Sequence, residues 1–188
     1  MLDFAGPFEV FSVTGKRDET DPFNVYTVAE SEGPILARNG LSVNPSFTFA
    51  NCPDPDILVV PGGYGARAQM VNSTVLAWVR EVADQAELVL SICTGSLILA
   101  KAGLLDGLAA TTHHLVLDLL AEVAPDTEVR GDVRVVDNGS VVTSAGVAAG
   151  MDMSFHVVAR LLGEQQALET AGYIEYPWTP QSATLPSQ

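Results

Sequence analysis

The sequence has little cysteine, little positive charge and no long apolar run, and each shortage excludes a class of protein. Two cysteines among 188 residues are too few for a disulfide scaffold and are typical of a reducing compartment. Nine basic residues against 23 acidic ones give a formal charge of −14, which would repel phosphate backbones. No apolar run approaches the roughly 18 residues that cross a bilayer, and the start lacks the basic segment of a secretion signal. We therefore expect a cytoplasmic protein that binds neither nucleic acid nor membrane.

What the sequence does contain is enough apolar material for one hydrophobic core. Hydrophobic residues make up 47% of the chain and charged residues 17%, and this length falls within the usual size of a single domain. We expect one domain over residues 1–178, followed by a mobile polar tail at 179–188.

Short β-branched runs alternate along the chain with stretches of helical periodicity. This alternation predicts an α/β fold of βα units around a mostly parallel sheet. The runs 57–60 and 88–92 are continuous and apolar, as in parallel strands that are buried on both faces. Between the runs 133–137 and 141–144, the pair Asn138-Gly139 predicts a two-residue hairpin turn.

Four helices are predicted from apolar residues that repeat every three or four positions. The first follows Ser73, which is the expected N-cap. The others cover residues 97–102, 151–162 and 165–173, and Gly163 is expected to end the third.

The strongest candidate for chemistry is Cys93, because sites in open α/β sheets form at the carboxyl ends of the strands. Cys93 follows the run 88–92 and precedes a helix, with the small residues Ser91 and Gly95 on either side, which is the layout of a nucleophile elbow. A helix N-terminus favours thiolate, so we expect the pKa of Cys93 to lie below its ordinary value of about 8.5. The alternative is a buried structural cysteine. Cys52 has no comparable setting and is expected to be structural.

A Gly-Gly pair, Gly62-Gly63, ends the neighbouring predicted strand. Where side chains are missing, backbone N–H groups can approach a substrate and stabilise a developing negative charge. The amides of Gly63 and Thr94 could therefore form an oxyanion hole. A flexible turn is the alternative interpretation of the pair.

Several segments resemble successive motifs of the ThiJ/PfpI superfamily, which shares the fold of class I glutamine amidotransferases. The matching segments, in order, are 2–10, 60–63, 92–96, 102–107, 111–113 and 143–146. The Leu-Asp segment at the start, together with Cys-Thr-Gly-Ser, is most similar to isocyanide hydratases, which add water to an isonitrile to give an N-substituted formamide. The same motifs occur in the sensor domains of AraC-type transcription regulators.

The resemblance implies a flavodoxin-like three-layer sandwich and a cofactor-independent hydro-lyase that acts on a small molecule. It also implies that Cys93 is the nucleophile, that Asp3 is its acid/base partner and that the amides of Gly63 and Thr94 are the stabilising donors. This chemistry needs no metal, because thiolate attack on the isonitrile carbon requires only a carboxyl group that shuttles protons. Without the resemblance, Asp3 would be interpreted as a solvated acid. A homodimer is expected from the same resemblance.

The chain departs from the superfamily at its start. Relatives carry a strand before the Leu-Asp segment, and a first strand in a flavodoxin-like sheet is central and buried on both faces. This sequence begins inside the segment. We therefore expect the first strand to be missing and the sheet to have a gap that something else fills; a start codon assigned too late is the alternative.

His113 is a possible secondary site residue, because it follows a predicted short strand at 109–112 and could pair with Cys93. A solvated or satisfied histidine is the commoner case, so both His113 and His114 are left outside the core site. Peptidase-like members carry His where this chain has Thr94, which argues against proteolysis. Glutamine amidotransferases use a His-x-Glu pair, which this sequence lacks.

Two functions other than hydration remain open. The first is a non-catalytic sensor domain, which would normally be fused to a basic helix-turn-helix part, and nothing of that kind follows Tyr176. The second is a glyoxalase or deglycase that acts on reactive carbonyls through an activated cysteine. Asp3 in place of a later Glu, and the Cys-Thr-Gly-Ser context, argue against it.

Overall fold

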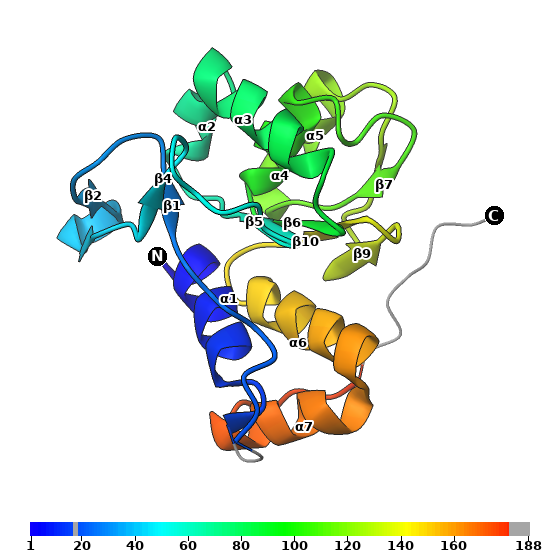
Figure 1. The fold of residues 1–188 in the computed structure, drawn as a ribbon. Helices are drawn as coiled ribbons and strands as arrows, with labels where there is room; N and C mark the ends of the chain where they lie inside the picture. Colours follow the sequence, from blue (N-terminus) through cyan, green and yellow to red (C-terminus); the bar gives the residue numbers. More distant parts are fainter. Residues whose placement is uncertain (17–18, 181–188) are drawn as a thin grey trace.

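The structure is a computed structural model that describes residues 1–16 and 19–180 (Figure 1). Its main sheet has the strand order β5 (Ile57–Val60), β6 (Leu88–Ile92), β10 (Val141–Ser144) and β9 (Val135–Asp137). β5, β6 and β10 run parallel, and β9 is antiparallel to β10. This arrangement confirms the predicted α/β class. Most of the tail that was expected to be mobile, residues 181–188, lies outside the described residues.

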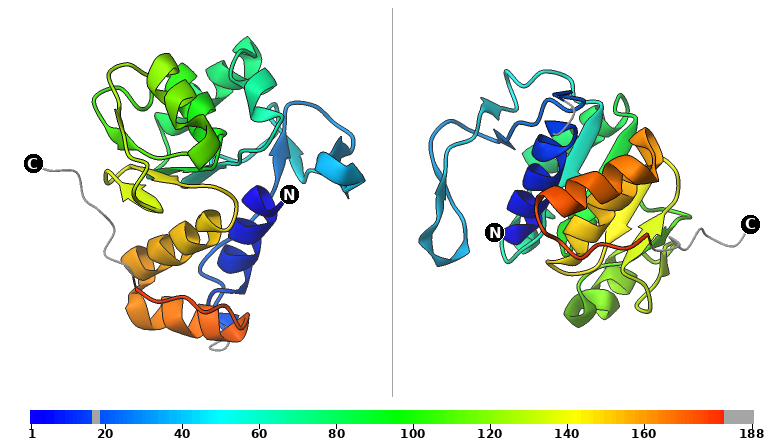
Figure 2. Two further views of the ribbon diagram at one scale, coloured as in Figure 1. Left: turned by 180° about the vertical axis from the view of Figure 1, so that it is seen from behind. Right: turned by 90° about the horizontal axis from the view of Figure 1, so that it is seen from below.

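Helices cover both faces of the main sheet (Figures 1 and 2). On one face lie α2 (Ala66–Gln69), α3 (Ser73–Ala83), α4 (Gly95–Lys101) and α5 (Leu117–Val123); on the other lie α1 (Leu2–Val13), α6 (Ala149–Leu162) and α7 (Glu164–Tyr173). Each face has its own core, because successive side chains of a strand point to opposite sides. In β6, Val89 packs with the first group of helices, whereas Leu90 and Ile92 pack with the second. The result is the predicted three-layer sandwich.

Helix α1 is formed by the Leu-Asp segment, for which the sequence pattern predicted no helix. It packs closely on α6: a Cβ added at Gly6 would lie 2.9 Å from Met151 Cγ. Val10 and Phe11 are buried in the same contact. Pro7 lies inside the helix and removes an N–H that would have bonded to the carbonyl of Asp3. Tertiary packing therefore maintains a helix that local sequence preference would not predict.

The remaining strands form three small sheets of two strands each. β1 (Val28–Ala29) pairs with β4 (Phe47–Thr48), β2 (Ile35–Leu36) with β3 (Ser42–Val43), and β7 (Ala109–Ala110) with β8 (Glu128–Val129). Two 3₁₀ helices, Arg38–Gly40 and His114–Val116, complete the described elements. β1 and β4 form a sheet separate from β5, so the described residues do show a gap in the sheet.

Two local predictions need correction. Asn72, not Ser73, is the N-cap of α3, because its side chain accepts a hydrogen bond from the Thr74 N–H at 3.0 Å. Leu162 ends the predicted apolar stripe of α6 but is 43% exposed. Helix α6 ends at Gly163, as predicted, where φ is +95°.

The hairpin turn between β9 and β10 is displaced by one residue from its predicted position. The N–H of Asn138 donates to the carbonyl of Val141 at 3.0 Å, so Gly139 and Ser140 form the two-residue loop, and Gly139 has a φ of +89°. The side chain of Asn138 bonds to both the N–H and the carbonyl of Ala109. Asn138 thus connects the hairpin to β7 instead of adopting the left-handed conformation expected of it.

No helix within residues 1–16 and 19–180 is long and apolar enough to cross a membrane.

Candidate active site

Cys93 occupies a sharp turn between β6 and α4, and its φ is +55°. A left-handed conformation costs a residue with a side chain about 1–2 kcal/mol, so the turn must be held by its surroundings. The N–H of Cys93 donates to the carbonyls of Ser144 and Ala145, both at 3.2 Å. Its own carbonyl accepts hydrogen bonds from the hydroxyls of Thr112 at 2.9 Å and Ser96 at 3.1 Å. These four hydrogen bonds fix the backbone of the predicted nucleophile elbow.

Two glycines allow the ends of β5 and β6 to approach each other. A Cβ added at Gly95 would lie 2.2 Å from the carbonyl oxygen of Val60, and one added at Gly62 would lie 2.5 Å from the Thr94 nitrogen. Both distances are far below a van der Waals contact. The spacing of small residues predicted the role of Gly95, whereas the role of Gly62 was missed.

The Cys93 thiol is 5% exposed. Burial, and then the charge of the Asp3 carboxyl, raise the pKa of Cys93, while hydrogen bonds from the amides of Thr94 and Val147 and from the Thr94 hydroxyl lower it. The net direction is upward, so the predicted depression is wrong in sign. The helix N-terminus favours thiolate, but removing the sulfur from water disfavours the charged form more strongly.

Asp3 lies in the first turn of α1 and is 5% exposed. It is close enough to Cys93 for its charge to disfavour the thiolate. Among the buried side-chain nitrogen and oxygen atoms of the described residues, only its Oδ2 and the Ser91 hydroxyl lack a hydrogen-bond partner. Buried polar atoms are normally satisfied, so an unpartnered carboxyl oxygen indicates a place for a water or ligand group.

The structure brings Gly63 and Thr94 together, but through the side chain of Thr94. The Gly63 N–H donates to the Thr94 hydroxyl, which donates to the Gly63 carbonyl, each at 2.9 Å. Gly63 has a φ of +108°, and a Cβ there would meet nothing within 4 Å. Glycine is therefore needed at this position for its conformation, not for space. The Gly63 amide is already hydrogen-bonded to the Thr94 hydroxyl, whereas the Thr94 amide is directed at the sulfur of Cys93.

Val147 supplies the second amide to the sulfur of Cys93, and sequence reasoning missed it. It follows the motif 143–146, and its φ is +50°, which is a rare conformation for a β-branched residue. The motif was the only signal that could have pointed to this loop. The loop after β10 thus contributes to the site as directly as the loop after β6.

His113 lies beside the site without joining it. Its Nδ1 accepts a hydrogen bond from the Leu115 N–H at 3.2 Å, and its ring stacks on His114 with centroids 4.4 Å apart. Its ring also packs against Gly146, where an added Cβ would lie 2.5 Å from Cδ2. Among the described residues, no hydrogen bond joins His113 to Cys93. His113 therefore matches the commoner case named above, a histidine whose contacts are satisfied outside the core site.

Cys52 differs from Cys93 in its surroundings. It is half-buried, it lies outside helices and strands, and its Sγ donates to the Pro53 carbonyl at 3.1 Å. Burial raises the pKa of Cys52, and a hydrogen bond with Tyr26 lowers it by less.

The sequence matches the DJ-1/PfpI family over residues 2–160. The chain belongs to this family. The match covers helix α1, the Cys93 turn and the loop that carries Val147, so the site just described lies within the shared region.

Three relatives illustrate the range of proteins that this chain resembles. It is 35% identical over 180 residues to an isonitrile hydratase of Pseudomonas putida, covering 96% of this chain and 75% of that protein. It is 32% identical over 171 residues to the HTH-type transcriptional regulator CdhR of Pseudomonas aeruginosa, covering 91% of this chain but only half of the regulator. The crystal structure of a ThiJ/PfpI family protein from Pseudomonas syringae superposes with a TM-score of 0.83 at 33% identity, covering 95% of this chain and 71% of the other.

Proposed function

We propose that this protein is a cysteine-dependent hydratase that adds water to an isonitrile and releases an N-substituted formamide. The observation that carries the proposal is the unpartnered Oδ2 of Asp3 in a buried position beside the Cys93 thiol. A buried carboxyl group next to a nucleophile is what the reaction needs, because proton transfer must accompany carbon–sulfur bond formation. The 35% identity to an isonitrile hydratase supports this choice of substrate class.

In the first proposed step, the sulfur of Cys93 attacks the terminal carbon of the isonitrile. The Asp3 carboxylate first accepts the thiol proton. A carbon–sulfur bond then forms, the carbon gains electron density, and Asp3 delivers that proton to it, giving a thioimidate in which the carbon is doubly bonded to nitrogen. The amides of Thr94 and Val147 lie at the sulfur and stabilise the thiolate before attack. Gly63 can act as a further donor when its bond to the Thr94 hydroxyl opens.

In the second proposed step, water adds to the thioimidate carbon. The Asp3 carboxylate accepts a proton from the water and passes it to the nitrogen as the carbon–nitrogen double bond becomes single. The tetrahedral intermediate then gives its hydroxyl proton to Asp3, expels the Cys93 thiolate and forms the carbonyl of the formamide, and Asp3 returns that proton to the sulfur. One isonitrile and one water enter and one formamide leaves, so atoms balance without an oxidant or reductant.

The rival proposal is a sensor domain that keeps the pocket but not the reaction, as the similarity to a transcriptional regulator would allow. The catalytic proposal is favoured by the pairing of Cys93 with the buried Asp3 carboxyl. A binding pocket alone has no need for a nucleophile held in a strained turn.

The test is an assay of purified protein with alkyl and aryl isonitriles, following formamide formation, beside a parallel assay of methylglyoxal loss. Cys93→Ser is the matched control, because it keeps size and hydrogen bonding but weakens the nucleophile. Formamide production that disappears in this variant supports the proposal. Saturable isonitrile binding without turnover supports the sensor, and methylglyoxal consumption without isonitrile turnover supports a deglycase.

A further inference from the structure

An arginine that meets no carboxylate stands out in this chain, which holds nine basic residues against 23 acidic ones. Ion pairs or hydrogen bonds to backbone carbonyls hold the guanidinium groups of Arg80, Arg130, Arg134 and Arg160. Within residues 1–16 and 19–180, the side chains of Arg38 and Arg67 form neither an ion pair nor a hydrogen bond, and their polar-group contacts are limited to an aromatic ring. The N–H donors of these two cations are therefore available to a ligand.

Both of these arginines lie against the ring of Tyr64. The central guanidinium carbon of Arg38 is 5.5 Å from the ring centroid, and that of Arg67 is 5.4 Å from it. Arg38 comes from the 3₁₀ helix between β2 and β3, and Arg67 comes from α2 (Figure 1). An aromatic face attracts a cation but leaves its charge in place. The ring thus brings two positive charges from separate elements together without neutralising them.

The chemistry of this Arg–Tyr–Arg cluster suits an anionic ligand. Like charges near one ring repel each other, and an anion bound to both would offset that repulsion. A guanidinium group is planar with its donors at the edge, so contact with an aromatic face leaves those donors free for bidentate bonds to a carboxylate. All three side chains belong to exposed residues, so a ligand can reach them from solvent.

The Arg–Tyr–Arg cluster lies at the same edge of the sheet as the nucleophile. Tyr64 directly follows Gly63, whose N–H and carbonyl both bond to the hydroxyl of Thr94 at 2.9 Å, and Thr94 directly follows Cys93. Cys93 is 5% exposed, whereas Tyr64 is 72% exposed. The loop after β5 therefore leads from the surroundings of the buried sulfur to solvent, and Tyr64 stands at its outer end.

A substrate that places its isonitrile carbon at the Cys93 sulfur must direct its nitrogen substituent away from the sulfur, because that carbon is terminal. We propose that the Arg–Tyr–Arg cluster binds a carboxylate on this substituent, so that the preferred substrates are isonitriles that carry an acid group; the inference rests on the proposed function. A formal charge of −14 repels anions from the surface as a whole. An anionic substrate therefore needs a local pair of cations beside the site, whereas an uncharged one would gain nothing from them.

The test compares isocyano carboxylates of increasing spacer length with their methyl esters, which have a similar shape but no charge. At one spacer length, kcat/KM for the carboxylate should exceed that for the ester by about tenfold or more, because charge-assisted hydrogen bonds form only with the carboxylate. The gain should fall on KM, since a group far from the reacting carbon binds equally in the ground state and the transition state. A preference that does not depend on spacer length would indicate general attraction to the surface and would contradict a fixed subsite.

Matched variants assign the preference to the Arg–Tyr–Arg cluster. Arg38→Met and Arg67→Met should each reduce the ratio of carboxylate to ester kcat/KM, and the double variant should bring it close to unity. Tyr64→Phe keeps the aromatic face and should keep the ratio, whereas Tyr64→Leu removes the face that orders both guanidinium groups and should lower it. Lys101→Met is the control for net charge, because it removes an exposed cation at the far end of α4, and it should leave the ratio unchanged.

The outcomes separate this inference from the proposed reaction. Turnover of esters and carboxylates with equal kcat/KM, or a ratio that survives in the double arginine variant, would overturn the subsite and leave the reaction standing. If no isonitrile of either kind is converted, the proposed reaction fails, and calorimetric binding of the same compounds tests the subsite alone. Carboxylate binding about tenfold tighter than ester binding, and lost in the double arginine variant, would support it. Equal affinities would overturn it.

Discussion

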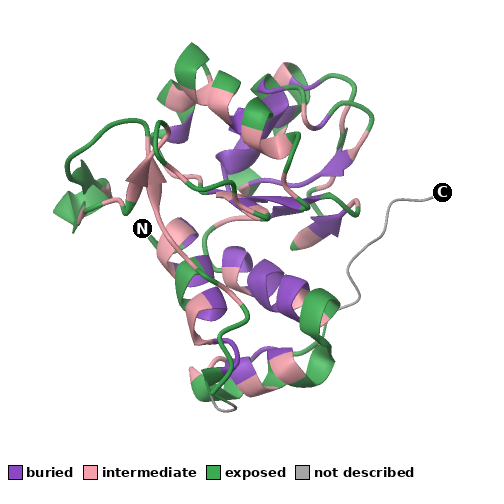
Figure 3. Cartoon of the chain, in the orientation of Figure 1, coloured by how far each residue is buried: buried purple, intermediate pink, exposed green. Residues whose placement is uncertain are grey.

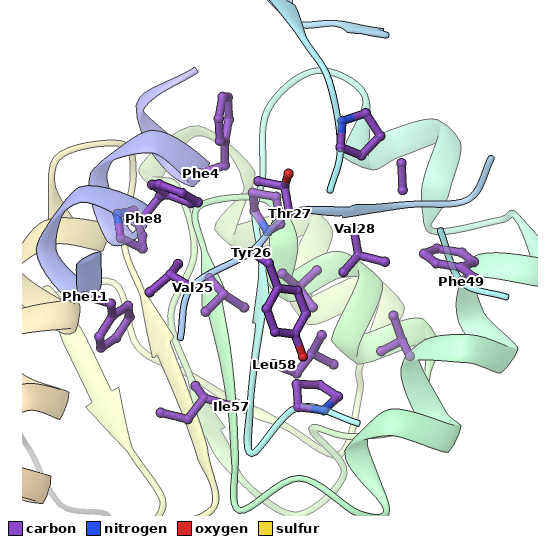
Figure 4. A pocket seen from close by; sticks show the side chains of 18 of the residues that line it. Phe4, Phe8, Phe11, Val25, Tyr26, Thr27, Val28, Phe49, Ile57 and Leu58 are labelled. Atoms are coloured by element: carbon purple, nitrogen blue, oxygen red, sulfur yellow. The ribbon is translucent and has the colours of Figure 1, made fainter. Parts of the chain in front are cut away.

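Two stretches of the molecule, 88–100 and 19–57, differ in how they are packed. Every residue of the first, which contains β6, Cys93 and most of α4, is buried, whereas the second, which contains β1 to β4 and the start of β5, has no buried residue (Figure 3). The first lies between two layers of helices, so each of its side chains reaches a core. The second is exposed or half-buried because its strands form small sheets apart from the main sheet and border a cavity of about 1020 Å³ that β5 and α1 also line (Figure 4). Cys93 therefore lies in a fully buried stretch of the fold.

The two candidate catalytic residues are held in place differently, because Cys93 lies inside the buried stretch 88–100 and Asp3 lies outside it, on α1. Cys93 is held by four backbone-directed hydrogen bonds inside the dense stretch. Asp3 lies on α1, whose N-cap Met1 makes no side-chain capping bond and whose aromatic residues line the cavity. The position of Cys93 is thus fixed locally, whereas that of Asp3 depends on how α1 packs.

The largest expected effect on turnover comes from substituting Cys93 and Asp3, singly and together. Cys93→Ala should reduce turnover by about 10³-fold or more, and Asp3→Asn by about 10²-fold or more. The double variant should be little worse than Cys93→Ala, because attack without proton delivery stalls at an adduct and a proton donor without a nucleophile has nothing to protonate. The measurement is kcat/KM for the best isonitrile in all four proteins.

Additive losses in that cycle would mean that Asp3 and Cys93 act independently. Near-normal turnover of Asp3→Asn would exclude Asp3 as the acid/base and would point to α1 as the poorly positioned element.

The second prediction concerns two glycines, Gly95 at the start of α4 and Gly63 in the loop after β5. Gly95→Ala should destabilise the protein by about 3 kcal/mol or more, because its Cβ would lie 2.2 Å from the Val60 carbonyl oxygen. Gly63→Ala should cost only about 1–2 kcal/mol, since its Cβ would meet nothing within 4 Å and only the left-handed conformation is penalised. Urea unfolding of both variants measures the difference. A larger loss for Gly63→Ala would reverse the expected order.

Much of the fold could be predicted from the sequence, because its strongest signals are local. Both apolar runs, 57–60 and 88–92, form strands as their composition predicted. The run 88–92 is buried on both faces, whereas Ile57 and Val59 of the other run are only half-buried, so its predicted burial on both faces is wrong. Helix α1 could not be predicted from periodicity, because its helical form depends on packing against α6 and not on an amphipathic pattern. The Asn138 turn was misplaced because its side chain bonds to Ala109, which is distant in the sequence.

The turn at Cys93 could be predicted from the sequence, whereas the surroundings of its thiol could not. The strand–cysteine–helix order located the strained turn at Cys93. The predicted downward shift of the Cys93 pKa was wrong, because residues of α6 and β10, and not only the helix that follows Cys93, bury its thiol. Val147 was missed because a role played by an amide leaves no trace in the identity of its side chain.

A third, smaller effect is expected from the two hydroxyls that bond to the Cys93 carbonyl. Ser96→Ala and Thr112→Val should each destabilise the protein by about 1 kcal/mol, because each removes one hydrogen bond and leaves the other. The double variant should lose more than the sum, since the buried carbonyl would then lose both hydroxyl partners. Urea midpoints of the four proteins give the coupling. Strictly additive losses of unfolding free energy would show that the two hydroxyls stabilise the turn independently of each other.

The smallest effect concerns the ionisation of the thiol itself. Burial and the Asp3 charge both raise the pKa of Cys93, so alkylation of Cys93 by iodoacetamide should rise with pH to a midpoint above the ordinary thiol value. Asp3→Asn removes the negative charge and leaves burial almost unchanged, so its midpoint should move to lower pH while staying above that value. Cys52 provides an internal control, because Asp3 is not among the groups that shift its pKa, and its midpoint should stay the same in both proteins. Mass spectrometry of the two cysteine peptides across a pH series measures both midpoints in one sample. An unchanged Cys93 midpoint in Asp3→Asn would show that the carboxyl does not act on the sulfur in solution, which would place the start of α1 away from the Cys93 turn.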